Sequence, residues 1–420
     1  MNDGTCSGDG AVLTEPPDGD DPPVGTGAGS LEVRSISEDE FAEHVRAAEE
    51  VSYQQTAEWA EARGGAWEHE LVGWFDAVGR RVGASVIRYQ ALPVIRYRIA
   101  YIPFGPVMDW GQVPIGGVLG SLRRYLEGRR VFAIRMYPPL HHRTWRSSTV
   151  HRALADSSLQ HLAHVRPDAI DPVAVRVVSV LREQGWRPLD DDEALESTQP
   201  RFTFRIPLAG RTEEDVFAGL TKAWRKNIRS AARQGLEVEP ASRDELREVH
   251  RLHVETAERS GFAAHPLSIM EFLWDRSNSA GPFALDVDLG RHEGEVLSGI
   301  ITASVGRVAY ALIAGNSAHR RELRASNAVY WAQIRRSIGR GATAYDLGGV
   351  RPSLDADDPR VGLLQFKIGL GGEVNEGIGG WDLPLRPALY SAFMRLYPLH
   401  SSAITALGNR VRRSRAGGSA

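Results

Sequence analysis

The pattern of apolar and polar residues occurs twice along this chain. In each half, two segments with helical periodicity precede two alternating segments, a third alternating segment and another helical one. Leu71–Trp74 and Gly83–Val86 in the first half correspond to Leu285–Asp288 and Leu297–Ile300 in the second. A duplication of this size constrains the fold strongly, because each copy must bury its own apolar face against its neighbours. The 420 residues suffice for two such units.

The expected elements follow this duplication. In the first copy we expect helices over residues 38–51, 56–63 and 116–126, and strands over 70–75, 83–90, 98–102 and 131–137. In the second copy we expect helices over 213–234, 243–260 and 325–340, and strands over 283–288, 296–304, 307–314 and 343–347. A mostly antiparallel sheet that splays in the middle fits this order. The expected fold is therefore α/β, with two acetyltransferase-like (GNAT-like) domains in tandem and a cleft between them.

The composition is that of an ordinary soluble protein, with 42% hydrophobic and 25% charged residues. A formal net charge of -3 excludes a globally basic nucleic-acid coat but allows local basic patches. Cys6 is the single cysteine, which excludes disulfides and cysteine-ligated metals. The histidines lack ligand spacing, so we expect no metal. No apolar run is long enough for a membrane span and no signal peptide is present, which indicates a cytoplasmic protein.

Both chain ends differ in composition from the rest. Residues 1–30 contain six acidic residues and no Lys or Arg, and are expected to be a disordered leader. Residues 401–420 form a basic flexible tail, for which a solvated end is favoured over contact with a membrane or RNA. Between them we expect the first domain at 31–200 and the second at 201–372.

Lysine is rare in this arginine-rich chain. Of the 50 basic residues only Lys222, Lys226 and Lys367 are lysines, which leaves 47 arginines. A lysine that persists against this bias indicates a position where an arginine cannot replace a compact ammonium, and chance retention is the alternative. Lys367 lies in the apolar, glycine-flanked segment Gly362–Gly372, where a lone cation needs a reason.

Five cations share one face of the expected helix over 213–234. Their spacings of three and four residues place them in one stripe, and no acidic residue interrupts it from Thr221 to Leu236. Such a stripe favours a phosphate ligand, either a pyrophosphate or an RNA backbone, over a merely solvated face. The stripe consists of Lys222, Arg225, Lys226, Arg229 and Arg233.

Three other positions are candidates for chemistry. Tyr310 stands on an expected strand that ends at the Gly315–Ser317 turn. Asp346 precedes two glycines, and a structural acid is favoured there over a catalytic base. Asp109 follows the rigid bend Pro103–Pro106, which would direct it toward the interdomain cleft.

Together these segments resemble the Fem family (FemA, FemB, FemX), the aminoacyl-tRNA-dependent peptidyltransferases that build peptidoglycan cross-bridges. The resemblance runs from about Leu31 to about Tyr397 and is closest to FemX-like members of high-GC Gram-positive bacteria. The motifs that carry it are Gln-x-x-x-Trp at 55–59, Tyr-Ile-Pro-x-Gly-Pro-x-x-Asp at 101–109, Arg-x-Asn-Ile-Arg at 225–229, Tyr-Asp-x-x-Gly at 345–349 and Gly-Leu-x-x-Phe-Lys-x-Gly-x-Gly-Gly at 362–372.

The resemblance implies the roles of individual residues. Arg63 and Arg225 match positions that hold a pyrophosphate, while Tyr101 and Tyr310 are expected to contact substrate. Phe366 and Lys367 match the pair beside the reacting centre, and Lys222, Lys226 and Arg229 are expected to contact tRNA or phosphate. The resemblance also implies that residues 373–400 complete the first domain and that the coiled-coil arm of some relatives is missing.

Two positions depart from the family pattern. Phe104 stands where the family often has an arginine, and Ala223 occupies the usual lysine position, with Lys222 one place away. Both departures leave the reaction class unchanged but bear on the identity of the acceptor.

The implied reaction is aminolysis. An amine on the third stem-peptide residue attacks the ester of an aminoacyl-tRNA, Lys367 stabilises the oxyanion, and Asp109 or a group on the substrate takes the proton. Glycine is the expected amino acid, and the acceptor is a muramyl pentapeptide linked to lipid (lipid II) or to UDP. We expect no cofactor beyond the aminoacyl-tRNA co-substrate. We further expect a monomer with peripheral contact at the inner membrane surface.

Three alternatives remain open from the sequence. The same chemistry could act on a peptide-antibiotic precursor or on a wall precursor altered for antibiotic resistance. Phe104 is the feature of the sequence that favours this alternative. An acetyl-CoA-dependent enzyme is disfavoured because Arg324 fills the glycine slot of the Arg321–Ser326 loop. A non-catalytic muramyl-peptide or RNA-binding paralogue is disfavoured by Lys367 in its full motif.

Overall fold

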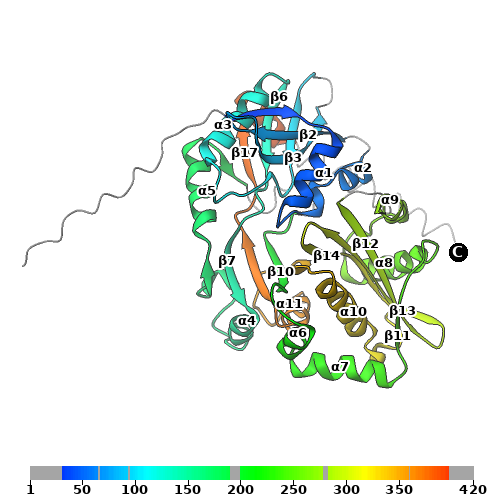
Figure 1. The fold of residues 1–420 in the computed structure, drawn as a ribbon. Coiled ribbons are helices and arrows are strands. Elements are labelled where there is room, and N and C mark those ends of the chain that lie inside the picture. The colour runs from blue at the N-terminus through cyan, green and yellow to red at the C-terminus, as the bar shows by residue number, and fades with distance from the viewer. Residues whose placement is uncertain are drawn as a thin grey trace, which may run out of the picture.

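The fold consists of two twisted sheets, one above the other, with helices packed on their faces (Figure 1). The computed structural model describes residues 31–64, 67–92, 95–189, 199–277, 282–358 and 360–396. The expected leader and basic tail lie outside the described residues. In the described part of the chain, no helix is both long and apolar enough to cross a membrane.

The first sheet has the strand order β1-β2-β3-β4-β6-β17-β9. Only β4 and β6 run parallel, and the helix α3 (Ile115–Glu127) connects them. The strands are β1 (Glu32–Ser35), β2 (Trp67–Phe75), β3 (Arg81–Ala91), β4 (Arg98–Ile102), β6 (Val131–Met136), β9 (Arg187–Pro188) and β17 (Trp381–Pro384), with β5 (Val107–Met108) paired to β3.

The second sheet has the order β11-β12-β13-β14-β15-β10-β16-β7-β8. Here β14 and β15 form the parallel pair, connected by α10 (Ala325–Gly339), so the hairpin–strand–helix–strand order of the first sheet recurs. The strands are β7 (His141–Arg146), β8 (Ala169–Ile170), β10 (Phe202–Pro207), β11 (Glu237–Pro240), β12 (Phe283–His292), β13 (Glu295–Val305), β14 (Val308–Asn316), β15 (Ala344–Gly349) and β16 (Glu373–Gly377). The predicted duplication is confirmed.

The parallel pair of the second sheet splays. Val308–Tyr310 pair with Ala344–Asp346, and beyond this point β14 continues to Asn316 without pairing to β15. The opening therefore begins at Tyr310 and Asp346, which oppose each other in the register.

Helices begin and end where the local sequence requires. Ser37 and Glu40 form a capping box at the start of α1 (Glu38–Ala47), and Gly261, with φ of 75°, ends α8 (Leu246–Ser260). The remaining helices are α2 (Ala57–Ala62), α4 (Ser147–Leu154), α5 (Pro172–Glu183), α6 (Glu213–Gly219), α7 (Lys222–Arg233), α9 (Leu267–Ser277) and α11 (Val361–Ile368), with short 3-10 turns at Tyr53–Gln55, Leu162–His164 and Arg321–Leu323.

The single helix expected over 213–234 is in fact two helices, α6 and α7. The backbone is extended at Leu220 and Thr221, and the Thr221 side chain accepts a hydrogen bond from the Trp224 N–H as the cap of α7. The break allows Leu220, which is 2% exposed, to reach the core. An uninterrupted periodicity conceals this break, because the cause is tertiary.

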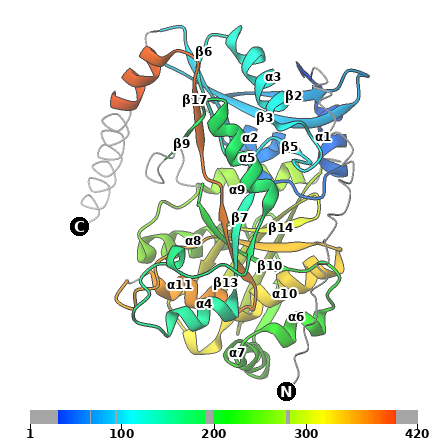
Figure 2. The ribbon, with the colours of Figure 1, turned by 90° about the vertical axis from the view of Figure 1, so that its left-hand side faces the viewer.

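Strands cross between the sheets. β7, β8 and α4 come from the range expected for the first domain, yet both strands pair into the second sheet, and β16 pairs there with β10 and β7. Figure 2 shows the chain then running up to β17, in the first sheet. A buried ion pair fastens β17, because Asp382 accepts bonds of 2.8 and 2.7 Å from the Arg135 guanidinium. The chain crosses from β9 in the first sheet to β10 in the second at the expected boundary of 200, but β7 and β8 lie in the second sheet, and the return to the first sheet follows β16 rather than preceding it at 373.

Candidate active site

Two cavities lie on either side of the splay in the second sheet. Cavity 1 has a volume of about 310 Å³ and is lined by strands of the second sheet, such as those of Arg205 and Tyr310, and by connecting segments of the first half of the chain, which include Glu50, Tyr53 and Phe104. Cavity 2 has a volume of about 730 Å³ and is lined by the start of α7, the start of α10 and residues of α11. The splaying strands β14 and β15 both contribute to the lining of cavity 1, and the end of β14 contributes Asn316 to that of cavity 2.

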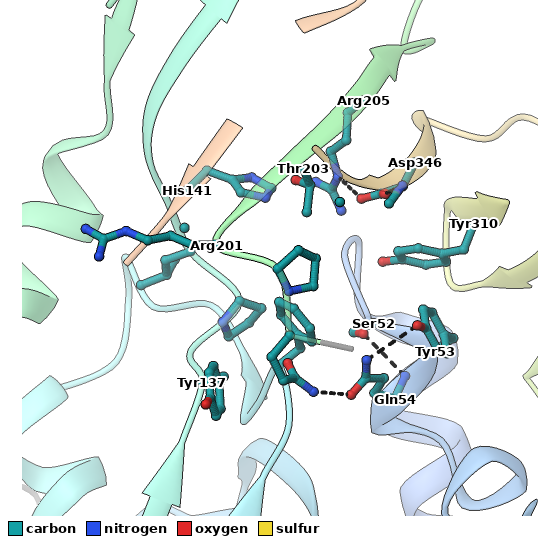
Figure 3. A pocket seen from close by; sticks show the side chains of 18 of the residues that line it. Ser52, Tyr53, Gln54, Tyr137, His141, Arg201, Thr203, Arg205, Tyr310 and Asp346 are labelled. Carbon is teal, nitrogen blue, oxygen red and sulfur yellow. Dashed lines mark hydrogen bonds and ion pairs between the residues drawn. The ribbon is translucent and has the colours of Figure 1, made fainter. Parts of the chain in front are cut away.

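A chain of alternating charges lies at the wall of cavity 1. The Arg205 guanidinium on β10 donates to Asp346 at 2.8 Å and to Glu50 at 2.5 Å, and all three residues line the cavity. Figure 3 shows Arg205 and Asp346 at one side of the cavity and the segment Ser52–Gln54 at the other. The two carboxylates compensate the charge of Arg205, which stands in a largely buried position.

The imidazoles in cavity 1 are neutral at pH 7. Burial lowers the pKa of His141 to about 4, with the Arg205 charge acting in the same direction. Burial also lowers the pKa of His265 to about 4. The cavity therefore combines neutral rings with an internally compensated set of charges.

Tyr310 is fixed at the opening of the splay. Its hydroxyl donates to the Val51 carbonyl oxygen at 2.9 Å, and its ring meets that of Tyr53 edge-on at 5.3 Å between centroids. Burial raises the pKa of its hydroxyl, so the group stays protonated. The structure thus places this predicted substrate-contacting residue in the wall of cavity 1.

Lys367 is buried and lines neither cavity, but its contacts and chain neighbours belong to both linings. Its ammonium donates to the carbonyl oxygens of Leu347 at 2.7 Å, Gly349 at 2.8 Å and Gly348 at 3.3 Å. Gly348 and Gly349 line cavity 1, whereas Phe366, beside Lys367 in α11, lines cavity 2. Burial lowers the pKa of Lys367 to about 8 against the opposing charge of Asp346, so the ammonium form still predominates at pH 7.

Cavity 2 is suited to an anion. Among the described residues no carboxylate lines it, whereas Arg259, Arg320, Arg321 and Arg324 do. Asn327, near the start of α10, is 6% exposed and lines the cavity. A polar side chain at a helix N-terminus is a favourable partner for a negatively charged oxygen.

The basic stripe on α7 leads to cavity 2. Lys222, Lys226 and Arg229 are exposed, while Trp224 and Asn227 of the same helix line the cavity. Trp224 anchors the helix, because its indole N–H donates to the Phe366 carbonyl at 3.1 Å and its ring packs 4.9 Å from that of Phe366. Predicted tRNA-contacting and substrate-binding residues are thereby brought together.

Arg225 turns away from the stripe. Its guanidinium donates to the Ala218 carbonyl at 2.7 Å and also to that of Leu220, at the end of α6. In this arrangement it stabilises the α6–α7 connection, and its predicted contact with pyrophosphate stays a prediction.

Arg63 and Tyr101 do not line cavity 1, but each interacts with a residue that does. Arg63, at the end of α2, contributes to the low pKa of His265 through its charge, and His265 lines the cavity. Tyr101 is fully buried, and its ring centroid lies 6.0 Å from that of Tyr137, another lining residue. Their roles as substrate-binding residues stay predictions.

Asp109 lies apart from this constellation. It is exposed and accepts a hydrogen bond from the Gly111 N–H at 2.9 Å, and it lines neither cavity. The structure does not bring it together with Lys367, and its catalytic role stays a prediction.

Sequence reasoning missed the Arg205 network and Asn327. A signal for Arg205 exists, since an arginine alternates with apolar residues in the strand Phe202–Pro207. No group of three or more His, Cys, Asp or Glu side chains in the described residues is arranged to hold a metal ion.

Two sheets of the same order, each with a parallel pair bridged by a helix, define a tandem GNAT-like protein. The crystal structure of FemX has this fold, with a TM-score of 0.71 at 19% identity over 86% of this chain and 99% of that one. The FemAB family model matches residues 36–269 and 288–397, and the chain belongs to the FemAB family. The predicted fold class and the resemblance to Fem proteins are both confirmed.

Curated relatives align with this chain over nearly their whole length. The lipid II:glycine glycyltransferase of Staphylococcus saprophyticus is 21% identical over 451 residues, which cover 91% of this chain and 100% of the relative. The protein of the same name from Staphylococcus aureus strain USA300 is 21% identical over 432 residues, with 86% and 94% covered.

Proposed function

We propose that this protein is an aminoacyltransferase that moves an amino acid, glycine, from aminoacyl-tRNA to the stem-peptide amino group of a peptidoglycan precursor. The observation that carries the proposal is that the buried Lys367 lines neither cavity but joins residues of both, since it donates to the carbonyls of Gly348 and Gly349 in the lining of cavity 1 and follows Phe366 in the lining of cavity 2. The names of the glycyltransferase relatives support both glycine and a lipid-linked acceptor.

Cavity 1 is the proposed acceptor site. Its aromatic and neutral imidazole lining, with charges compensated internally, suits a sugar–peptide substrate. Cavity 2 is the proposed donor site, because its arginines and the basic stripe on α7 suit the phosphates of a tRNA end. In this arrangement the ester carbonyl carbon of the donor would lie at the splay, where the amine of the acceptor could attack it.

The chemistry is ester aminolysis. The acceptor amine attacks the carbonyl carbon, a C–N bond forms, the bond to the ribose oxygen breaks, and the amine proton ends on that oxygen. We assign oxyanion stabilisation to Lys367, for which the Gly348 carbonyl, the most distant of its three partners at 3.3 Å, would give way. Asp109 would have to approach from outside cavity 1 to take the proton, whereas a hydroxyl on the substrate would need no such movement.

A peripheral position at the cytoplasmic membrane face is part of the proposal. A lipid-linked acceptor carries its own anchor, so the enzyme needs only to reach the headgroup layer. The chain would then act as a monomer with no cofactor beyond its tRNA co-substrate.

The test incubates purified protein with a mixture of radiolabelled aminoacyl-tRNAs and either lipid II or UDP-muramyl pentapeptide. We expect labelled glycine to appear on the lipid-linked acceptor. Transfer to the UDP-linked precursor alone would correct the acceptor, and transfer of another amino acid would correct the donor. No transfer to either acceptor, with intact tRNA ester as the control, would refute the proposal.

A further inference from the structure

Backbone strain in this protein gathers at the two cavities. In the described part of the chain five residues other than glycine have left-handed φ values: Phe104, Arg130, Glu293, Arg320 and Arg324. Phe104 lines cavity 1, and Arg320 and Arg324 line cavity 2. Such conformations persist where the surroundings enforce them, and they concentrate at functional sites.

Phe104 is the bulkiest of these residues, with a φ of 43°. Its neighbours hold the turn from both sides: the Gly105 N–H donates to the Tyr137 carbonyl at 3.0 Å, and the Gln55 amide donates to the Pro103 carbonyl at 2.7 Å. Gln55 is fully buried and also accepts from the Val86 N–H at 2.8 Å. The backbone of the turn is therefore fixed without any contribution from the Phe104 ring.

The Phe104 ring is not part of the hydrophobic core formed by the described residues. Phe104 is half-buried, belongs to none of the hydrophobic clusters formed by the described residues, and pairs with no other aromatic ring among them. A glycine at this position would remove the strain. The chain instead keeps a large apolar side chain in a costly conformation at the wall of cavity 1, which folding alone does not explain.

We propose that Phe104 is a specificity-determining residue that presents its ring as a platform for an uncharged face of the acceptor. This inference rests on the proposed acceptor role of cavity 1. Aromatic platforms bind the apolar face of a sugar ring or a peptide segment, and either part of a muramyl peptide could supply it. Because the Phe104 ring carries neither a charge nor a hydrogen-bond donor, it favours a neutral group over a charged one.

The experiment compares three variants, Phe104→Ala, Phe104→Gly and Phe104→Tyr, for binding of MurNAc-pentapeptide without nucleotide or lipid. Calorimetry is expected to show affinity reduced about five- to tenfold in the first two variants and retained in Phe104→Tyr. The same titrations with the free pentapeptide identify the source: a difference that vanishes assigns the platform to the sugar, and one that persists assigns it to the peptide.

Thermal melting separates this role from a structural one. Phe104→Gly is expected to melt about 1–3 °C above Phe104→Ala, because glycine removes the strain while both variants lack the ring. Arg130, with φ of 55° and outside both cavities, is the matched control. Arg130→Ala and Arg130→Gly should show the same order of melting with unchanged affinity.

Equal binding by wild type and Phe104→Ala would overturn the platform, as would the absence of saturable binding by the wild type up to millimolar probe. Binding that depends on Phe104 without any transfer of label would retain the platform and refute the proposed function instead.

Discussion

The three carbonyls around Lys367 satisfy all the donors of a single ammonium group. An ammonium has three protons, and the oxygens of Leu347, Gly348 and Gly349 accept them in a buried position. A guanidinium is planar and larger, so it cannot reproduce this arrangement. This geometry gives a physical reason for a lysine in a chain in which 47 of the 50 basic residues are arginines.

Replacement of Lys367 should therefore abolish most transfer. We expect Lys367→Met and Lys367→Arg each to lower kcat by on the order of a hundredfold, because the first removes the charge and the second misplaces it. Single-turnover transfer from glycyl-tRNA measures this directly, with the melting temperature as a check on folding. Near-normal turnover in either variant would remove Lys367 from the chemistry.

Asp288 is a buried acid whose charge the fold disfavours. It is 0% exposed on β12, accepts a bond of 2.7 Å from Arg336 on α10, and has no hydrogen bond to its second carboxylate oxygen in the described residues. Burial raises the pKa of Asp288 to about 6, against the opposing charge of Arg336. Between pH 4 and 6 the folded protein thus binds a proton that the unfolded chain releases.

Acid should therefore stabilise the wild type relative to a variant that lacks the Asp288 carboxyl group. As the pH falls from 7 to 4, the free energy of unfolding of the wild type should rise relative to that of Asp288→Asn, by roughly 2–3 kcal/mol. Urea denaturation of both proteins at pH 7, 5.5 and 4 measures the difference. A difference independent of pH would show that the carboxyl group titrates normally.

At the scale of elements, the junction of α6 and α7 depends on a close backbone contact. Gly371 has a φ of 72°, and a Cβ atom there would lie 2.1 Å from the carbonyl oxygen of Gly219. Real Cβ atoms do not approach backbone this closely, so the chain must keep glycine at Gly371 for α6 to pack against the loop after α11.

Gly371→Ala should consequently destabilise the protein by roughly 3 kcal/mol or more, through steric overlap added to conformational strain. Gly235→Ala is the matched control, since Gly235 has a φ of 77° with open space around it. It should cost only about 1 kcal/mol. Urea denaturation of both variants checks the contrast, and equal losses would mean that the contact at Gly219 relaxes easily.

Elements determined by local sequence were predictable, and those determined by distant contacts were not. β4 matches its predicted range of 98–102, and α10 and β13 match theirs within one residue at each end, because apolar periodicity defines them. The short strands β7 and β16 carry little periodicity and form by pairing with each other across the chain. α11 was missed because glycines crowd its flanks.

The residues of the candidate site also fall into those predictable from local sequence and those determined by distant contacts. Lys367, Tyr310 and Phe366 were identified from motifs, and the structure places them around the splay. The ion pairs of Arg205 join residues 155 and 141 positions apart, a separation at which no local pattern exists. Asp109 shows the converse case, since a rigid bend in the sequence did not direct its side chain into either cavity.

At the scale of the whole molecule, α7 offers an exposed basic edge with no carboxylate in the helix. Substitution of Lys222, Lys226 and Arg229 by Gln should weaken tRNA binding to a similar extent whatever the nucleotide sequence of the tRNA. It should also reduce the slope of log affinity against log salt by about one for each phosphate that the variant no longer neutralises. Filter binding at several salt concentrations measures both.

The control replaces three exposed arginines of the first sheet's helices, Arg123, Arg124 and Arg176. These substitutions remove the same charge but should leave the salt slope unchanged. A similar decrease of slope in both triple variants would attribute tRNA binding to overall charge rather than to α7.

The crossing strands also limit how the molecule can open. β7 and β16 belong to the second sheet, while the adjoining strands β6 and β17 belong to the first. We therefore expect the two sheets to resist a hinge motion that would separate them. Under the proposed function, the tRNA and the lipid-bound precursor would then have to reach the two cavities without a wide separation of the sheets. We also expect neither half of the chain to fold when it is produced by itself, because each half supplies strands to the other's sheet.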